Sequence, residues 1–141
     1  MGRQMEFDLF QQCLLELKIN GKPAGDMLEE LIFSIQDLDP VKEHDIFYPQ
    51  GMFNHKELNL FFITKFTMTM IEVGDYPKIT TWKNKEISSC ELTILDRYDI
   101  QLNINFKDGK VVELNSKLDT NDTWSSRFKE KILDIYKMLN F

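Results

Sequence analysis

The stretch from Tyr98 to Ser116 constrains the fold more than any other, because it predicts both arms and the turn of a β-hairpin. Apolar and polar residues alternate strictly in the first arm, which is typical of a strand with one buried face. The second arm runs from Lys110 to Ser116, and Lys107-Asp108-Gly109 joins the two arms. The apolar residues of the first arm are Ile100, Leu102, Ile104 and Phe106.

Two loop lengths fit the turn residues of this hairpin. A two-residue Asp108-Gly109 turn would place Ile104 opposite Glu113, which puts a carboxylate on the apolar face. A three-residue loop with Gly109 in the left-handed conformation keeps apolar residues opposite one another. Because a slip of one residue turns every side chain over, we predict the three-residue loop with a bulge at Gly109. The pairs it predicts are Ile104 with Val112 and Leu102 with Leu114.

The composition favours a single domain over residues 1–141, since 43% of the residues are apolar and this length can bury a core. No apolar run approaches the roughly 20 residues that span a bilayer. The N-terminus has no apolar signal region. We therefore expect a cytoplasmic protein.

The charge excludes some classes of partner. A net charge of −6 argues against nucleic acid and anionic membranes, which need clustered Lys and Arg. Residues 1–56 carry 10 acidic and 5 basic residues, whereas residues 57–141 carry 13 and 12. The N-terminal third is therefore the acidic part.

Residues 1–40 predict a helical hairpin outside the strand-rich region. The first helix lies at about 5–18. The second begins at an Asp26 cap and ends at Pro40. The apolar stripes are Phe7, Phe10, Leu14 and Leu17 on the first helix, and Met27, Leu31, Ile35 and Leu38 on the second, flanked by Leu28 and Phe33.

Residues 45–118 predict an antiparallel sheet. The segment Asp45 to Phe53 fits either a short edge strand or a loop, since Pro49 interrupts it. Leu58 to Val73 alternates for so long that we expect a bend or split at Thr64-Lys65. Further strands are predicted at 79–82 and 86–95. One face should carry Leu58, Leu60, Phe62, Phe66, Met68 and Met70, and the opposite face the apolar residues Phe61, Ile63 and Ile71.

Residues 121–140 predict a helix that caps the sheet. Asn121 or Asp122 can serve as its N-cap. Lys137 suits the negative end of the helix dipole. The apolar stripe, which should cover one open end or face of the sheet, is Trp124, Phe128, Ile132, Ile135 and Leu139.

The order of these elements resembles the pleckstrin-homology-like superfold, in particular its small bacterial and GRAM-like versions. The resemblance covers roughly two thirds of the chain and implies a half-open antiparallel barrel closed at one end by the final helix, with two added N-terminal helices. The residues that carry it are Phe62-Ile63-Thr64-Lys65, Ile87-Ser88-Ser89-Cys90-Glu91-Leu92, the hairpin Asn105-Phe106-Lys107-Asp108-Gly109-Lys110, and Trp124.

The resemblance implies a scaffold often used for protein or peptide binding, and fold alone does not fix function. Phosphoinositide-binding members carry a basic cluster on the first hairpin. Lys65 stands alone at the equivalent place, so we expect no phosphoinositide binding.

The residues that could support catalysis show no strong pattern. His44 and His55 are eleven apart with no Cys or His at ligand spacing, so we expect two surface histidines and no metal or cofactor. Cys13 and Cys90 fit small core residues better than reactive thiols. The turn from Asp96 to Asp99 fits a solvated β-turn.

These observations favour a non-enzymatic interaction module that binds a protein partner or another copy of itself. One alternative is a small metal-dependent hydrolase using His44, His55, Asp45 and Asp96; another is a sensor that holds an apolar small ligand in the half-barrel. Phe61, Ile63 and Ile71 are either covered by the N-terminal helices or part of a partner surface. The candidate binding residues are Phe7, Phe10, Leu31, Phe33, Phe61, Ile63 and Ile71.

Overall fold

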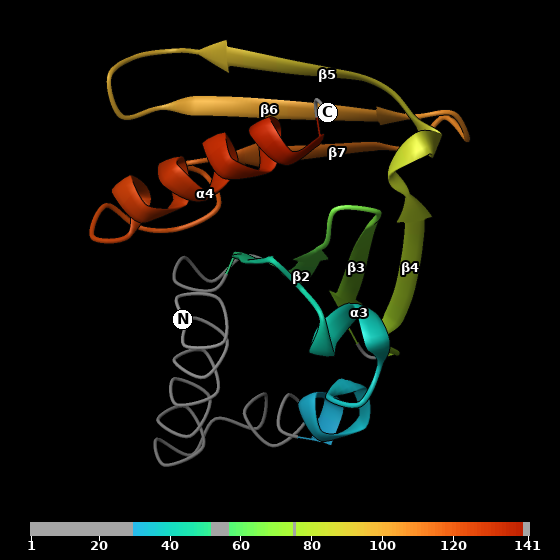
Figure 1. The fold of residues 1–141 in the computed structure, drawn as a ribbon. Coiled ribbons are helices and arrows are strands. Elements are labelled where there is room, and N and C mark those ends of the chain that lie inside the picture. Colours follow the sequence, from blue (N-terminus) through green and yellow to red (C-terminus); the bar gives the residue numbers. More distant parts are fainter. Residues whose placement is uncertain (1–29, 52–56, 75, 140–141) are drawn as a thin grey trace.

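The computed structural model describes residues 30–51, 57–74 and 76–139, which fold into two antiparallel sheets and several helices (Figure 1). The larger sheet has the strand order β1-β2-β3-β4 and the smaller has the order β5-β6-β7. An α+β fold with antiparallel strands and a C-terminal helix is thereby confirmed. No pairing among the described strands joins the two sheets, so they do not close into a barrel.

The elements follow the predicted order. The four-stranded sheet comprises β1 (Ile46–Gln50), β2 (Leu58–Ile63), β3 (Thr67–Val73) and β4 (Lys78–Lys83). The three-stranded sheet comprises β5 (Ile87–Ile94), β6 (Ile100–Phe106) and β7 (Val111–Asn115). The helices are α3 (Asp39–Lys42), a 3-10 turn (Asn84–Glu86) and α4 (Ser125–Leu139), and residues 30–35 are also helical.

The predicted hairpin of β6 and β7 is confirmed in length and register. The Phe106 N–H donates to the Lys110 carbonyl oxygen at 2.9 Å, which leaves three residues in the loop. Gly109 has a φ of 90°, a conformation that L side chains rarely adopt. The opposed residues are Ile104 with Val112 and Leu102 with Leu114.

The long alternation splits into β2 and β3 near the predicted point. The Thr64 hydroxyl accepts the N–H groups of Phe66 at 3.1 Å and Thr67 at 3.0 Å, which stabilises the reversal. The reversal exchanges the faces, so the prediction of one continuous apolar face was wrong. One face carries Leu60, Phe62 and Ile71, and the other carries Phe61, Ile63 and Met68.

The segment after residue 45 is a strand, and β1 lies at the edge of its sheet. Pro49 is part of it, opposite Leu60 on β2. An edge strand tolerates proline because one row of its N–H groups makes no ladder bonds. The edge-strand interpretation of Asp45 to Phe53 is therefore correct for the residues the structure describes.

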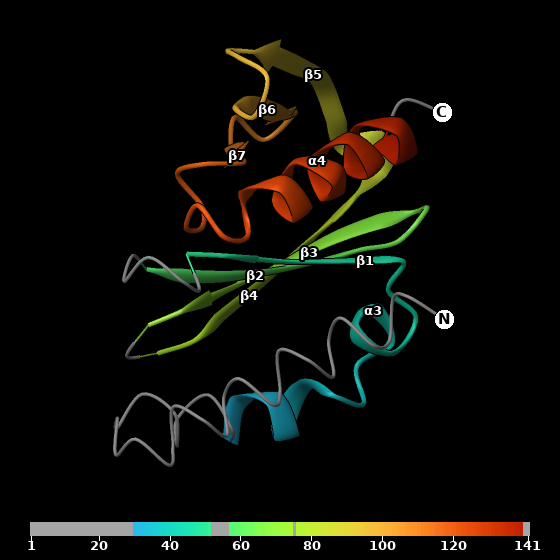
Figure 2. The same cartoon turned by 90° about the vertical axis from the view of Figure 1, so that its left-hand side faces the viewer.

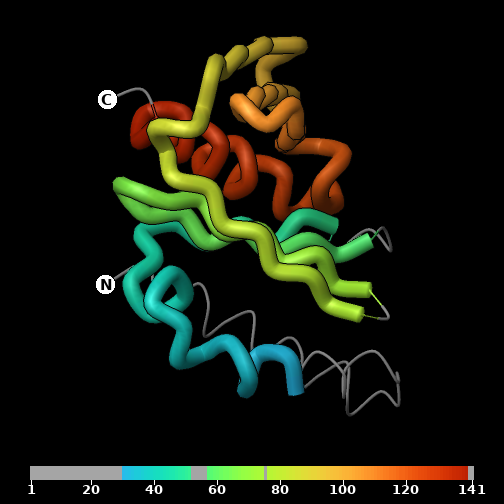
Figure 3. Tube along the Cα trace, turned by 90° about the vertical axis from the view of Figure 1, so that its right-hand side faces the viewer, coloured from blue at the N-terminus to red at the C-terminus, as the bar shows by residue number. Residues whose placement is uncertain are grey.

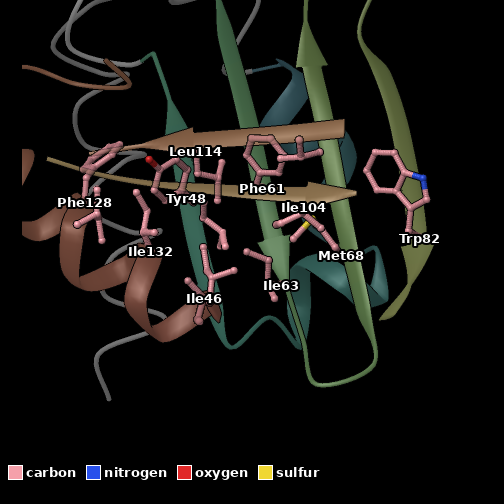
Figure 4. Packing of buried hydrophobic residues seen from close by; sticks show 14 of the residues in the cluster. Ile46, Tyr48, Phe61, Ile63, Met68, Trp82, Ile104, Leu114, Phe128 and Ile132 are labelled. Atoms are coloured by element: carbon pink, nitrogen blue, oxygen red, sulfur yellow. The ribbon is translucent and has the colours of Figure 1, made fainter. Parts of the chain in front are cut away.

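The elements form layers around the four-stranded sheet (Figure 2). Its first face packs against the three-stranded sheet and α4, and its second face packs against α3 and residues 30–35. Figure 4 shows the larger core, in which Tyr48, Phe61 and Met68 meet Ile104 and Leu114 of the other sheet, while Phe128 and Ile132 reach in from α4. Both faces of the central sheet are therefore buried.

Residues 30–42 cover the second face of the four-stranded sheet (Figure 3). Ile32 and Ile35 are the buried residues of the helical turn, whereas Leu38 is 40% exposed. The prediction that Leu38 lies on the buried stripe of the second helix was therefore wrong. The preceding helix ends at Ile35, so the prediction that it ends at Pro40 was wrong. Pro40 lies in the first turn of α3, where its missing N–H has no cost. The predicted helix at 5–18 lies outside the described residues.

The C-terminal helix lies within the predicted range 121–140, but it begins only at Ser125, so the predicted start was wrong. Phe128, Ile132 and Ile135 are buried against both sheets. The Asn121 side-chain oxygen accepts the Trp124 N–H at 3.1 Å in the turn that precedes the helix. Trp124 is half-buried, with the Arg127 guanidinium 4.8 Å above its ring.

Candidate binding cleft

The residues predicted to bind a partner occupy different environments. Phe33 is 74% exposed on the helical turn 30–35, and Leu31 beside it is half-buried. Phe61, Ile63 and Ile71 are at most 1% exposed, so they belong to the core and form no surface patch. Residues 30–42 cover Ile71, as one alternative expected, whereas Phe61 and Ile63 face α4 and the other sheet. Phe7 and Phe10 lie outside the described residues.

The expectation of a surface histidine was wrong for His44. Its ring is 6% exposed and makes edge contacts with Phe62 and Phe47, at centroid distances of 5.4 and 6.3 Å. Its Nδ1 donates to the Val41 carbonyl oxygen at 2.5 Å. His44 thus packs with the core on the second face of the four-stranded sheet. His55 lies outside the described residues.

Asp96, one of the two carboxylates of the hydrolase alternative, does not lie beside His44, whereas Asp45 follows His44 directly in the chain. Asp96 lies in the turn between β5 and β6, where its oxygen accepts the N–H groups of Tyr98 at 2.8 Å and Asp99 at 3.0 Å. Lys117 pairs with it at 3.5 Å. These bonds lower the pKa of the Asp96 carboxyl, the Tyr98 N–H contributing most. Within the described ranges, no three His, Cys, Asp or Glu side chains are placed to hold a metal ion.

Cys90 is half-buried on β5 and packs against the larger core, as expected of a small core residue. Burial raises the pKa of its thiol, which disfavours the reactive thiolate. Cys13 lies outside the described residues.

A cleft of about 300 Å³ opens between the two sheets on the side away from α3. Its floor comes from the inner face of the four-stranded sheet, where Phe61, Met70 and Trp82 lie beside Asn59 and Glu72, and β7 forms the facing wall. The lining residues are Gln50, Asn59, Phe61, Met70, Glu72, Trp82, Lys110, Val111, Val112 and Glu113.

Trp82 is held in place at the cleft by the β6–β7 hairpin. Its ring stacks on Phe106 at a centroid distance of 4.2 Å, and its indole N–H donates to the Asp108 carboxylate at 3.0 Å. The Lys110 N–H and the Trp82 indole lower the pKa of the Asp108 carboxyl. The loop that sets the hairpin register therefore also fixes this aromatic wall.

The polar rim of the cleft is tied together by the Gln50 side chain. Its amide nitrogen donates to the Glu113 carbonyl oxygen at 2.8 Å and to the Asp119 carboxylate at 2.9 Å. Its amide oxygen accepts from the Asn59 side chain at 3.1 Å. These bonds link β1, β2 and β7 at one edge of the cleft.

Asp119 anchors this rim from the buried side. Its carboxylate accepts the Tyr48 hydroxyl at 2.6 Å and the Asn115 N–H at 2.7 Å. Burial and the Asp119 charge raise the pKa of Tyr48 well above its usual value. The network joins β1 to the segment that leads from β7 into α4.

Charged residues of both signs lie around the mouth of the cleft. Lys110 lies 5.8 Å from the centre of the Trp82 ring and next to the Asp108 carboxylate, which offsets its charge. Glu72 lies opposite Lys78 in the register of β3 and β4. The Glu113 carboxylate accepts the Gln101 side-chain amide at 3.4 Å, on the face of the three-stranded sheet that points away from the core.

No protein family model matches this chain, and no curated protein matches it significantly. In the described ranges, no helix combines the length and apolar character needed to cross a bilayer. What the protein binds is therefore inferred from its own side chains.

Sequence analysis did not identify this cleft, because its residues come from strands that are brought together by packing of the two sheets. One signal was available. Gln50, Asn59 and Glu72 lie in register across β1, β2 and β3. They interrupt the apolar face at the same level of the sheet, which indicates the mouth of a cleft once the register is known.

Proposed function

We propose that this protein is a non-catalytic binding module that takes part of a protein partner into the cleft between its sheets. The observation that carries the proposal is the combination of apolar residues on the floor, Phe61 and Met70, with a rim fixed by hydrogen bonds. Protein interfaces commonly place one buried anchor side chain in such a preformed pocket.

The order of elements supports a PH-like assignment as part of this proposal. A four-stranded antiparallel sheet, a three-stranded antiparallel sheet and a terminal helix follow one another along the chain. That order agrees with the resemblance to the pleckstrin-homology-like superfold. Such a scaffold in the cytoplasm, often used for protein or peptide binding, is consistent with a module whose site lies between its sheets.

Affinity capture from cell lysate, with proteins identified by mass spectrometry, tests the proposal. Val111→Asp introduces a charge at the mouth of the cleft on a side chain that is 55% exposed, so the fold should tolerate it. Tyr76→Asp is the matched control, because Tyr76 is 92% exposed and outside the cleft. Wild type and Tyr76→Asp should recover a common partner that Val111→Asp loses. Equal recovery of the partner by all three proteins would show that the cleft does not bind it.

The size of the cleft favours one second candidate, a sensor for an apolar small ligand. A volume of about 300 Å³ lies at the lower end of small-molecule pockets. Native mass spectrometry of the purified chain distinguishes the two functions. A bound mass of a few hundred daltons that Val111→Asp loses would favour the small ligand, and an unmodified mass would favour the protein partner.

A further inference from the structure

The edge strand β5 carries an apolar row that the rest of the described chain covers incompletely. Cys90, Leu92 and Ile94 lie in register with three apolar residues of β6 that are at most 1% exposed. Cys90 and Leu92 are only half-buried, however, and Ile94 is 72% exposed. The core face of the three-stranded sheet therefore continues onto an open edge.

The backbone groups of the same three residues point away from β6. The Leu95 N–H donates to the Asp99 carbonyl oxygen at 2.8 Å. In an antiparallel pair, every second residue directs its backbone groups to the partner strand. Residues 89, 91 and 93 therefore face β6, and residues 90, 92 and 94 direct their N–H and carbonyl groups outward. These outward groups have no hydrogen-bond partner among the residues the structure describes.

The other edge strands of the described sheets carry features that hinder the addition of a strand. In β1, Pro49 has no N–H, and Lys131 of α4 donates to the Phe47 carbonyl oxygen. The strand β4 begins and ends with lysine, a residue that natural edges use against pairing. At β7, the Gln50 side chain already occupies one carbonyl oxygen. By contrast, β5 contains no proline, and its single charged residue, Glu91, alternates with the core-facing row.

The position of β5 leaves room for another strand. It is the strand of its sheet that lies farthest from the four-stranded sheet, as Figures 1 and 2 show from two directions. One flank of α4 lies beside it, because the Lys129 side chain donates to the Arg97 carbonyl oxygen in the β5–β6 turn. Leu133 and Tyr136 follow Lys129 on this flank and are half-buried. The open edge thus has apolar residues on both β5 and α4.

We propose that β5 pairs antiparallel with β5 of a second copy of this chain, which forms a two-fold symmetric dimer. The open row is self-complementary, because an antiparallel copy places apolar residues opposite apolar residues on the core face. A two-fold interface requires such a self-complementary patch. The second copy therefore fits this edge through the same residues that leave it open.

The sequence of β5 disfavours two of the possible registers. Pairing centred on Glu91 would place two carboxylates directly opposite each other, which is destabilising. Pairing centred on Cys90 would place Leu92 opposite the irregular pairing between Ile87 and Ser89, where a bulge interrupts the strand. Both registers therefore cost stability.

Pairing centred on Leu92 meets neither obstacle. It places Leu92 opposite Leu92 of the second copy, and Cys90 opposite Ile94 in both directions. Glu91 then lies opposite Thr93, so no like charges meet. Each core-face pair exchanges two backbone hydrogen bonds. A centre at Thr93 would leave fewer such pairs, so the dimer is centred on Leu92.

The dimer joins the two three-stranded sheets into one sheet of order β7-β6-β5-β5-β6-β7. Because β7 is the edge opposite β5, both β7 strands remain at the outside. The two clefts therefore stay open, and the dimer presents them to partners as a bivalent unit. Pairing of β5 itself does not depend on what the cleft binds.

Sedimentation velocity of the full chain over a range of concentrations tests the dimer. Wild type should approach twice the mass of 16.7 kDa. Ile94→Lys places a charge on the exposed end of the core-facing row and should raise the dimer dissociation constant about tenfold or more. Thr93→Lys is the matched control, because its side chain points to the other face, opposite Glu91 of the second copy. It should change the constant about threefold or less.

Disulfide cross-linking tests the register. In a hydrogen-bonded antiparallel pair the Cα atoms lie about 5.5 Å apart, which a disulfide can span. In a Cys13→Ser background, Ile94→Cys should therefore link to Cys90 of the second copy on oxidation with copper phenanthroline. The product is a covalent dimer on a non-reducing gel. Adding Cys90→Ser to the same variant should abolish that dimer.

Two results would overturn the proposal. One is a wild-type chain that stays monomeric up to about 100 μM, a concentration at which even weak specific interfaces form. The other is a dimer that Ile94→Lys and Thr93→Lys weaken equally and that Ile94→Cys does not cross-link, since that dimer would use another surface. The cross-link does not depend on how well Ile94→Lys folds, so the proposal stays testable if that variant is unstable.

Discussion

Asp119 shows how one buried carboxylate can organise a binding site. It accepts hydrogen bonds from Tyr48, Gln50 and the Asn115 backbone, and so connects the rim of the cleft to the approach of α4. Buried charges are tolerated when hydrogen bonds satisfy them.

Tyr48→Phe removes one of these bonds without changing the packing of the ring. A hydrogen bond to a charged group contributes about 1.5–3 kcal/mol, so the free energy of unfolding should fall by that amount. Urea denaturation measures the change, with Tyr76→Phe as an exposed control.

The same tyrosine predicts a pH dependence of stability. Because the folded pKa of Tyr48 is raised, its contribution to the free energy of unfolding is present below the unfolded pKa of about 10 and is lost above it. The variant should therefore lose less stability than wild type as the pH rises past 10.

Asp108 predicts the opposite pH dependence at the hairpin loop. Its folded pKa is lowered, so its contribution is present above the unfolded pKa of about 3.9 and is lost as the pH falls through the lowered folded value. Asp108→Asn should show a smaller fall in urea midpoint than wild type between pH 6 and pH 3. A fall in Asp108→Asn as large as in wild type would contradict the assignment.

At the scale of elements, the β6–β7 hairpin depends on the left-handed conformation of Gly109. A Cβ at Gly109 would meet nothing within 4 Å, so the cost of a substitution lies in the backbone alone. Gly109→Val should lower the free energy of unfolding by about 1–3 kcal/mol. Gly74→Ala is a suitable control, because Gly74 also has open space and its φ is not positive. Equal stability of the two variants in urea would show that the loop adopts another conformation.

The terminal helix contributes most through its central residues. Ile132 is fully buried, and Ile132→Ala should cost about 2–5 kcal/mol. Trp124 is half-buried at the start of the helix, so Trp124→Ala should cost less than Ile132→Ala. Thermal unfolding of the two variants gives the order, and a larger loss for Trp124→Ala would contradict the packing of α4.

Across the whole molecule, local sequence patterns predicted the strands and helices. The burial of single residues, the faces of the strands and the position of the cleft depend on tertiary packing. Glu113 excluded the wrong hairpin register because it would have faced the core, and this argument needed no long-range information. The burial of His44 depended on Phe47 and Phe62, which are placed by the sheet. The faces of β2 and β3 depended on where the chain reversed. The cleft could not be predicted because Trp82 and Gln50 meet β7 only after both sheets have packed.

Hydrogen exchange of the β7 backbone amides, measured by NMR on the full chain, tests the open edge of the cleft most directly. Val112 and Leu114 face β6, so their amides should exchange slowly. Val111 and Glu113 face the cleft and should exchange much faster. Equal protection of the Val111 and Val112 amides would show that the edge is already covered and would contradict the account.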